Sequence, residues 1–230
     1  MKKIYLQHRT QEAKGSARDF VYDTLKEQII SLELKPNVKI SEQDIADELN
    51  VSRTPVREAF LKLSQENLLT VYPQKGTIVS KIDLELVEEG RFVREKIESA
   101  IVKEACETFG EEQLFQLESN LTMQTLCLEK GSYHRLFTLD DEFHQLLFAG
   151  CNKLRTWRMI RNMNSHFDRL RMLRLASNPD WNVVVSQHKE IYKFIAQKEA
   201  KQAENLIIEH LNLVNYEKED LRIHYPNYFK

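Results

Sequence analysis

Glycine and proline are scarce in this sequence, with six Gly and five Pro among 230 residues. Both residues interrupt helices, Gly through its backbone entropy and Pro through its missing N–H. Their scarcity argues against a fold built from many tight turns. It predicts long helices joined by short connections.

Cysteine is also scarce, because Cys106, Cys127 and Cys151 are an odd number with no C-x-x-C spacing. This pattern excludes a disulfide framework and a thiolate metal site, and it favours a reducing compartment. No run of about 18 apolar residues occurs, so we expect no transmembrane helix. MKKIYLQHRTQEAKGS lacks the apolar stretch of a signal peptide, and we expect residues 1–16 to be a flexible tail. The sequence thus predicts a cytoplasmic protein.

The sequence also has no large excess of positive or negative charge. It holds 33 Lys and Arg and 35 Asp and Glu, which gives a net charge of −2. Overall charge therefore indicates neither a nucleic acid nor a membrane as partner. Any contact with DNA must depend on the local placement of basic residues.

Residues 17–80 carry the strongest local signals. Apolar spacing predicts three helices, in ARDFVYDTLKEQIISLEL, SEQDIADEL and RTPVREAFLKLSQENLL. Ser41 and Ser52 stand at the expected N-caps of the second and third helices. The alternation in TVYPQKGTIVS predicts a two-stranded hairpin with Lys75 and Gly76 near its tip. Three helices followed by a β-hairpin are the pattern of a winged helix-turn-helix.

The third helix is the one expected to contact DNA. Arg53 and Arg57 lie four residues apart near its N-terminus, beside Ser52 and Thr54. Side chains at this end of a recognition helix meet base edges and phosphates, and an Arg fork can bond two acceptors of guanine. The alternative is a solvated basic turn on an ordinary three-helix bundle. The hairpin that follows, with Lys75 at its tip, favours the DNA-binding interpretation.

SRTPVREAFLKLSQENLL resembles the recognition helix of the GntR family of bacterial transcription regulators. The resemblance extends over SEQDIADELNVS and the YPQKGTIV wing. It implies DNA contacts from Ser52, Arg53, Thr54 and Arg57, with Gly76 at the tip of the wing.

Four positions depart from the family pattern. Leu32, Asn37 and Asn67 stand where Gly is common. Asn tolerates a left-handed backbone, so Asn37 and Asn67 need not disturb their turns, and we expect Leu32 to change packing only. Gln43 stands where some members carry a DNA-contacting Arg, so no contact is carried over to it.

The rest of the chain has helical period with few breaks, and we expect a second domain over 83–220 and a C-terminal tail over 221–230. The expected helices of this domain are 83–109, 111–129, 132–149, 153–175, 180–198 and 200–220. The predicted fold class is mainly α, a winged helix-turn-helix followed by an all-helical antiparallel bundle.

The stretch LDDEFHQLLF places Asp140 and His144 on one helix face together with Phe143. His188 and His210 lie on the apolar faces of two later helices. A lone histidine in such a position is usually a core residue with a hydrogen-bond partner. Three histidines and an aspartate from three helices of one bundle instead match the donor set of a zinc-like divalent ion.

This region resembles the FCD effector domain of FadR-subgroup GntR regulators, whose metal-binding members carry Asp-x3-His and then one His on each of two later helices. The resemblance implies metal ligation by Asp140, His144, His188 and His210. Three imidazoles and a carboxylate favour Zn²⁺ or Ni²⁺, with Mn²⁺ as a third candidate. Asp141 lies off the apolar line, and we expect it to face solvent.

FVREKIES is similar to a segment of the first effector helix of that domain, and it makes Arg94 a candidate to hold an effector carboxylate. The alternative is that Arg94 pairs with Glu98 one turn further on. Arg169, Arg171 and Arg174 could also line a pocket, although Arg-rich faces are usually solvated.

These features predict a ligand-responsive bacterial transcription regulator, usually a repressor in this family, which binds a small organic acid. Residues 1–80 hold twelve Lys and Arg against eleven Asp and Glu, so a single module would bind DNA weakly. A homodimer on a near-palindromic double-stranded operator would bind far better.

Two alternatives to this function are a metal-dependent hydrolase with an accessory winged helix, and a dimerisation bundle whose metal is purely structural. No H-E-x-x-H motif supports the hydrolase.

Overall fold

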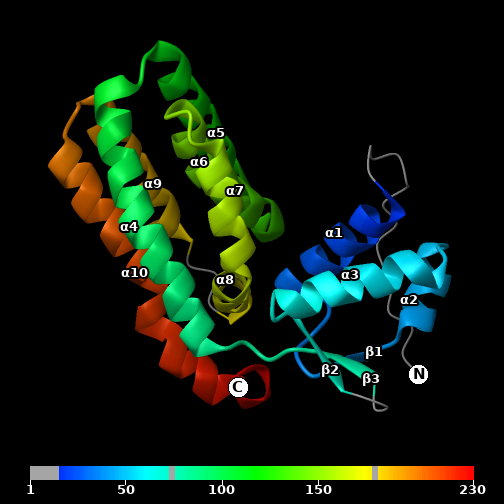
Figure 1. The fold of residues 1–230 in the computed structure, drawn as a ribbon. Helices are drawn as coiled ribbons and strands as arrows, with labels where there is room; N and C mark the ends of the chain where they lie inside the picture. The colour runs from blue at the N-terminus through cyan, green and yellow to red at the C-terminus, as the bar shows by residue number, and fades with distance from the viewer. Residues whose placement is uncertain (1–15, 73–75, 178–180) are drawn as a thin grey trace. The chain divides into compact units, whose positions relative to one another are not determined.

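The computed structural model describes residues 16–72, 76–177 and 181–230 (Figure 1). The chain divides into two compact units. The first is the chain up to Leu84 together with Tyr225–Lys230, and the second is Glu85–His224. No helix in the described ranges is long and apolar enough to cross a membrane.

The first unit contains three helices, α1 (Ala17–Ile30), α2 (Glu42–Leu49) and α3 (Arg53–Gln65). Ser16 caps α1 and Ser41 caps α2, each accepting a hydrogen bond from the backbone N–H three residues on. The helices enclose one apolar core, whose members include Leu25, Ile45 and Phe60. The winged helix-turn-helix expected from the sequence is confirmed.

The sheet of this unit has one strand more than the expected hairpin. Strands β2 (Leu69–Tyr72) and β3 (Gly76–Val79) are antiparallel, and β1 (Lys39–Ile40) pairs with the other edge of β3. The order is β1-β3-β2. A strand of two residues is too short to show alternation in sequence, and β1 forms because β3 offers it an unpaired edge.

Several turns of this unit use left-handed backbone. Asn37 and Asn67 have φ of 67° and 60°, as expected for residues at Gly positions. Leu32 also has a positive φ, 63°, so its departure from Gly affects the backbone as well as the packing. A β-carbon makes this conformation unfavourable, and Leu32 therefore carries local strain.

The second unit is the expected all-helical bundle. Its helices are α4 (Leu84–Thr108), α5 (Glu111–Glu129), α6 (Tyr133–Gly150), α7 (Leu154–Met163), α8 (Ser165–Ser177), α9 (Asn182–Ala196) and α10 (Ala200–His224).

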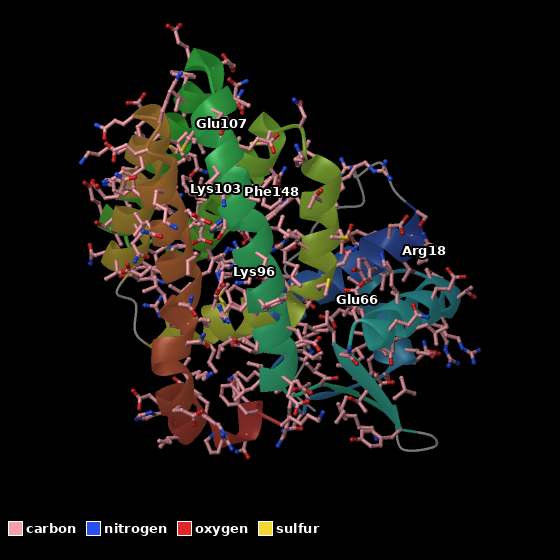
Figure 2. All side chains as sticks on the ribbon, turned by 60° about the vertical axis from the view of Figure 1, so that its left-hand side comes forward. Arg18, Glu66, Lys96, Lys103, Glu107 and Phe148 are labelled. Carbon is pink, nitrogen blue, oxygen red and sulfur yellow. The ribbon has the colours of Figure 1, made fainter. Side chains whose placement is uncertain are left out.

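Two polar contacts show that α4 and α10 are antiparallel. Asn212 Nδ2 lies 3.5 Å from Glu95, and Lys103 Nζ lies 2.8 Å from Glu204, so residue numbers rise along one helix as they fall along the other. Figure 2 shows Lys96, Lys103 and Glu107 along α4, and all of them are exposed. Phe148 of α6 is instead fully buried in the apolar core of the bundle.

The expected single helix 153–175 is wrong, because the structure divides it into α7 and α8 at Asn164. Asn164 is buried, and its side chain lies against Gly90 of α4. A β-carbon at position 90 would come within 2.9 Å of Asn164 Oδ1, so Gly90 permits this close approach. The sequence NMNSH contains neither Gly nor Pro, but Asn is a preferred N-cap residue, and the carbonyl of Asn164 accepts from Asp168 N at 2.8 Å at the start of α8.

The expected C-terminal tail 221–230 is structured. Helix α10 continues to His224 because Leu221 extends its apolar face. Beyond it, Phe229 pairs with Ile82 in an isolated parallel bridge. Ile82 N donates to the carbonyl of Tyr228 at 2.8 Å, and Lys230 N donates to the carbonyl of Ile82 at 3.0 Å.

Burial explains why this segment is ordered. Phe229 is 3% exposed and Ile82 is fully buried, so the bridge joins two apolar side chains. At its edge, Asn37 Nδ2 donates to the carbonyl of Asn227 at 2.9 Å, and Lys230 Nζ pairs with Asp83 at 2.7 Å. The end of the chain is therefore part of the first unit.

Replacing Phe229 with Ala should release this segment locally and accelerate amide hydrogen exchange at Ile82. The free energy of unfolding should fall by about 1–3 kcal/mol, less than for an internal Phe, because a chain end can detach without unfolding the core. Ile223→Ala is the matched control, since Ile223 is 73% exposed. Unchanged exchange at Ile82 in Phe229→Ala would contradict this assignment.

Candidate metal and DNA-binding sites

The structure brings four expected ligands together. Asp140 and His144 of α6, His188 of α9 and His210 of α10 each offer one ligand atom, and these atoms lie within 4.8 Å of one another. All four side chains are buried. Asp140 and His144 meet because residues four apart share a helix face. The other two arrive from separate helices, so this assembly depends on the tertiary fold.

The Nε2 atoms of the three imidazoles converge. Nε2 of His210 lies 3.2 Å from that of His188 and 3.3 Å from that of His144. Asp140 carboxylate oxygens lie 3.8 Å from His188 Nε2 and 4.0 Å from His144 Nε2. The ring of His188 also stacks on Phe143, with 4.1 Å between centroids and an interplanar angle of 17°.

The opposite nitrogen of each imidazole meets a polar side chain. Nδ1 of His144 lies 2.6 Å from Glu98 Oε2. Nδ1 of His188 lies 2.9 Å from Gln124 Oε1, and Nδ1 of His210 lies 3.2 Å from Gln187 Oε1. Metal-binding histidines usually have such a partner on their second nitrogen. The sequence did not lead us to expect the two glutamines here; the available signal was an amide within each apolar helix face.

Burial and neighbouring charges shape the ionisation of the cluster. Burial, reinforced by the nearby cations, lowers the pKa of His188 and His210 well below the ordinary value and leaves both imidazoles neutral. Burial also raises the pKa of Asp140, and Arg171 offsets this only in part. For Glu98 burial acts in the same direction, but Arg94 and His144 outweigh it and lower the pKa to about 2.

Asp141 does not face solvent as expected. Its side chain is 16% exposed and accepts hydrogen bonds from Arg161 Nη1 at 2.7 Å and Arg171 Nη1 at 3.0 Å. Desolvation opposes its ionisation, but the two guanidiniums outweigh this and lower the pKa to about 2. Arg171 also pairs with Asp140 and with Asp168. The sequence could not show these partners of Asp141, because they lie on two other helices, Arg161 on α7 and Arg171 on α8.

Arg94 forms the pair with Glu98 that we considered as an alternative, with Nε 2.5 Å from Oε1. It also lines a cavity of about 30 Å³ together with Asp140, Arg171, Arg174 and His210. Its Nη2 has no hydrogen-bond partner among the described residues. A cavity of this size holds about one water, so a small organic acid would require the lining side chains to move apart.

The DNA-contact candidates Ser52, Arg53, Thr54 and Arg57 are all exposed on the first turns of α3. Arg53 Nη2 lies 3.1 Å from Glu42, a weak surface pair that leaves its side chain 64% exposed. Ser52 occupies the N-cap, but its hydroxyl makes no capping hydrogen bond.

The wing candidates are only partly described. Gly76 has φ of 104°, a left-handed backbone conformation that residues with a β-carbon rarely adopt, so glycine is strongly favoured there. Lys39 is exposed on β1 and adds a cation to this edge of the sheet that was not expected from the sequence. Lys75 lies outside the described residues.

Family models match both units. Residues 17–79 match the bacterial regulatory proteins of the gntR family, and residues 90–213 match the FCD domain. The chain belongs to the GntR family and carries an FCD domain.

The curated relatives agree with this assignment. The HTH-type transcriptional repressor RspR of Escherichia coli K12 is 31% identical over 209 residues, covering 91% of this chain and 92% of RspR. An uncharacterized HTH-type transcriptional regulator of Streptomyces ambofaciens is 32% identical over 212 residues, covering 91% of this chain and 88% of that protein. This GntR-family chain is therefore a DNA-binding transcriptional regulator and not an enzyme.

Solved structures share the fold. The structure of E. coli McbR/YncC has a TM-score of 0.77 at 21% identity, covering 92% of this chain and 99% of that one. A putative GntR transcriptional regulator from Rhodococcus sp. RHA1 has a TM-score of 0.73 at 23% identity, covering 94% of this chain and 100% of that one. At these identities the likeness shows the fold alone.

Replacing Asp141 with Asn should lower the free energy of unfolding by about 2 kcal/mol at pH 7, because two partly buried guanidiniums lose their charged acceptor. The pKa of Asp141 is lowered, so its contribution is complete above the ordinary Asp value and is lost as the pH falls through about 2. Denaturant unfolding at pH 7 and pH 2 measures the difference. Glu142→Gln is the control, since Glu142 forms only an exposed pair with Arg135. Equal stability of Asp141→Asn and wild type at pH 7 would contradict the ion-pair role.

Proposed function

We propose that this GntR regulator is a homodimeric, cytoplasmic repressor whose FCD domain binds a divalent metal ion and a small carboxylate effector. The observation that carries the proposal is the convergence of three buried imidazole Nε2 atoms and the Asp140 carboxylate. Repressor action is supported by the name of the relative RspR.

The donor set supports a transition-metal ion. Burial keeps two of the imidazoles neutral, which is the form that ligates a metal, and it raises the pKa of the Asp140 carboxyl more than Arg171 lowers it, so a divalent cation at this point would stabilise the carboxylate further. Nitrogen-rich sites favour Zn²⁺ or Ni²⁺, whereas Mg²⁺ and Ca²⁺ prefer oxygen. Mn²⁺ remains a third candidate. Asp140, His144, His188 and His210 would hold the ion.

The charge of the cavity beside these ligands suits an organic anion. Arg94, Arg171 and Arg174 line it, and a guanidinium can bind both oxygens of a carboxylate. Arg94 retains one unsatisfied nitrogen, Nη2, although Glu98 occupies its Nε. Opening the cavity to admit an effector would move α8, α9 or α10, which supply most of its lining. Such a movement is the step that effector binding would couple to DNA affinity.

The first unit would contact the operator through Ser52, Arg53, Thr54 and Arg57, with Lys75 and Gly76 at the wing. All four α3 residues are exposed near the N-terminus of the helix, where recognition helices meet the major groove. The near balance of charge in residues 1–80 favours two linked modules, hence a dimer on a near-palindromic site.

A purely structural metal is the second candidate, because the four ligands tie α6, α9 and α10 to one point. Chelation distinguishes the two roles. A structural ion would leave the bundle unfolded when removed, whereas a sensor ion would leave it folded and abolish the effector response. Circular dichroism and effector-dependent DNA binding, measured before and after chelation, report these outcomes.

Untagged wild-type protein should contain one divalent ion per chain by elemental analysis. His188→Ala should lose the ion and the effector response together while retaining basal DNA binding, because only the second unit is altered. His224→Ala is the matched control, since His224 is exposed at the end of α10. Wild-type protein that carries no metal and takes up no added Zn²⁺ would refute the metal site.

Arg53→Ala and Arg57→Ala should each weaken binding to a DNA fragment selected by the wild-type protein by about 1–3 kcal/mol. Both variants should also relax the preference for the selected sequence. Arg18→Ala removes an exposed arginine from α1 and controls for the loss of charge alone. If either variant bound with wild-type affinity and preference, that arginine would have no part in reading the operator.

A further inference from the structure

We infer that Glu98, Gln124 and Gln187 are positioning residues that hold all three imidazoles in one tautomer, with the hydrogen on Nδ1 and the Nε2 lone pair directed at the common centre. The inference rests on the proposed function, since it concerns how the same cluster is prepared for a metal ion. It adds residues of α4, α5 and α9 to the four ligands.

Gln124 can only accept a hydrogen bond from His188. Its Nε2 donates to Asn120 Oδ1 at 2.7 Å and lies 3.4 Å from the carbonyl oxygen of Leu139. Asn120 Nδ2 donates to the same carbonyl at 3.1 Å, so its Oδ1 is an acceptor. A backbone carbonyl cannot donate, and this sets the orientation of both amides. Gln124 Oε1 therefore faces His188 Nδ1, which must carry the hydrogen.

Gln187 is oriented in the same way by a carboxylate. Its Nε2 donates to Glu209 Oε1 at 3.1 Å, and an ionised carboxylate is only an acceptor. Oε1 of Gln187 is thus the atom that lies 3.2 Å from His210 Nδ1. His210 must also carry its hydrogen on Nδ1.

Glu98 contacts the third imidazole, that of His144, with a carboxylate oxygen. Its Oε1 accepts from Arg94 Nε at 2.5 Å, and its Oε2 lies 2.6 Å from His144 Nδ1. This close contact does not have the geometry of a hydrogen bond, but a carboxylate oxygen is only an acceptor, so the 2.6 Å approach favours the hydrogen on Nδ1 of His144.

The consequence is a centre with three convergent lone pairs. An imidazole that donates from Nδ1 and keeps a lone pair on Nε2 has no hydrogen at Nε2, so the 3.2 Å contact between the Nε2 atoms of His188 and His210 contains no hydrogen to share. Such a contact is repulsive without a cation and becomes favourable when a metal ion lies between the nitrogens. The surrounding polar residues therefore prepare the site for nitrogen ligation by Nε2 alone.

Glu98→Gln provides a selective test because it preserves shape and reverses one tautomer. The amide oxygen must face Arg94 Nε, a donor, which turns the amide NH₂ towards His144 Nδ1. His144 would then accept on Nδ1 and carry its hydrogen on Nε2, where no lone pair remains for a metal. Glu95→Gln is the matched control, since Glu95 lies on the same helix and pairs with Arg91 instead.

The measurement uses the full-length chain, labelled with ¹⁵N-histidine and stripped of metal, and reads the tautomer of each imidazole by NMR. Wild-type and Glu95→Gln proteins should show the hydrogen on Nδ1 of His144, His188 and His210. In Glu98→Gln only His144 should change, and the Kd for Zn²⁺, measured by chelator competition, should rise about 10–100-fold.

Two results would overturn the inference: a wild-type spectrum with the hydrogen on Nε2 of any of the three histidines, or an unchanged His144 tautomer in Glu98→Gln. The tautomers of the wild-type protein are measured without any substitution, so they would still test the inference if the Glu98→Gln variant failed to fold. Failure of the proposed function has a different signature, since wild-type protein would then show these tautomers and bind no Zn²⁺.

Discussion

Ionisable side chains buried in the helical core impose the main constraint on the second unit. An unpaired buried charge costs several kcal/mol, so each group must meet a partner supplied by another turn or another helix. Arg94, Glu98 and His144 form one such series, from α4 to α6. Asp140 and Arg171 extend the network to α8. The helices that carry these residues must therefore keep their mutual register for the cluster to stay satisfied.

Helix α10 connects this cluster to the first unit through the covalent chain. His210 belongs to the buried cluster, and the residues that follow His224 belong to the DNA-binding unit. The chain thus passes from one unit to the other twice, after Leu84 and after His224. The β-bridge between Ile82 and Phe229 pairs the segment before the first of these points with the segment after the second. A displacement of α10 has a direct covalent route to the winged helix, which is the kind of physical connection that coupling between sites requires.

Local signals predicted most elements of the fold. The cap at Ser41, the apolar faces of the helices and the alternation around the wing depend on neighbours in sequence, and the structure contains the elements they indicate. The break at Asn164 and the short strand β1 were not expected from the sequence; in the structure Asn164 lies close to Gly90, and β1 pairs with the open edge of β3. The order of the C-terminal segment depends likewise on burial of Phe229 against a distant residue.

The sequence by itself determined the two-part architecture, the exposed arginines of α3 and the pairing of Asp140 with His144, since helical periodicity places residues four apart on one face. Only the tertiary structure decided that His188 and His210 reach the same point, that Asp141 is held by two guanidiniums, and that Gln124 and Gln187 orient the imidazoles. The physical reason is that hydrogen bonds and ion pairs in a bundle core join residues from different helices. Their partners follow from how the helices pack, which the spacing within any one helix does not specify.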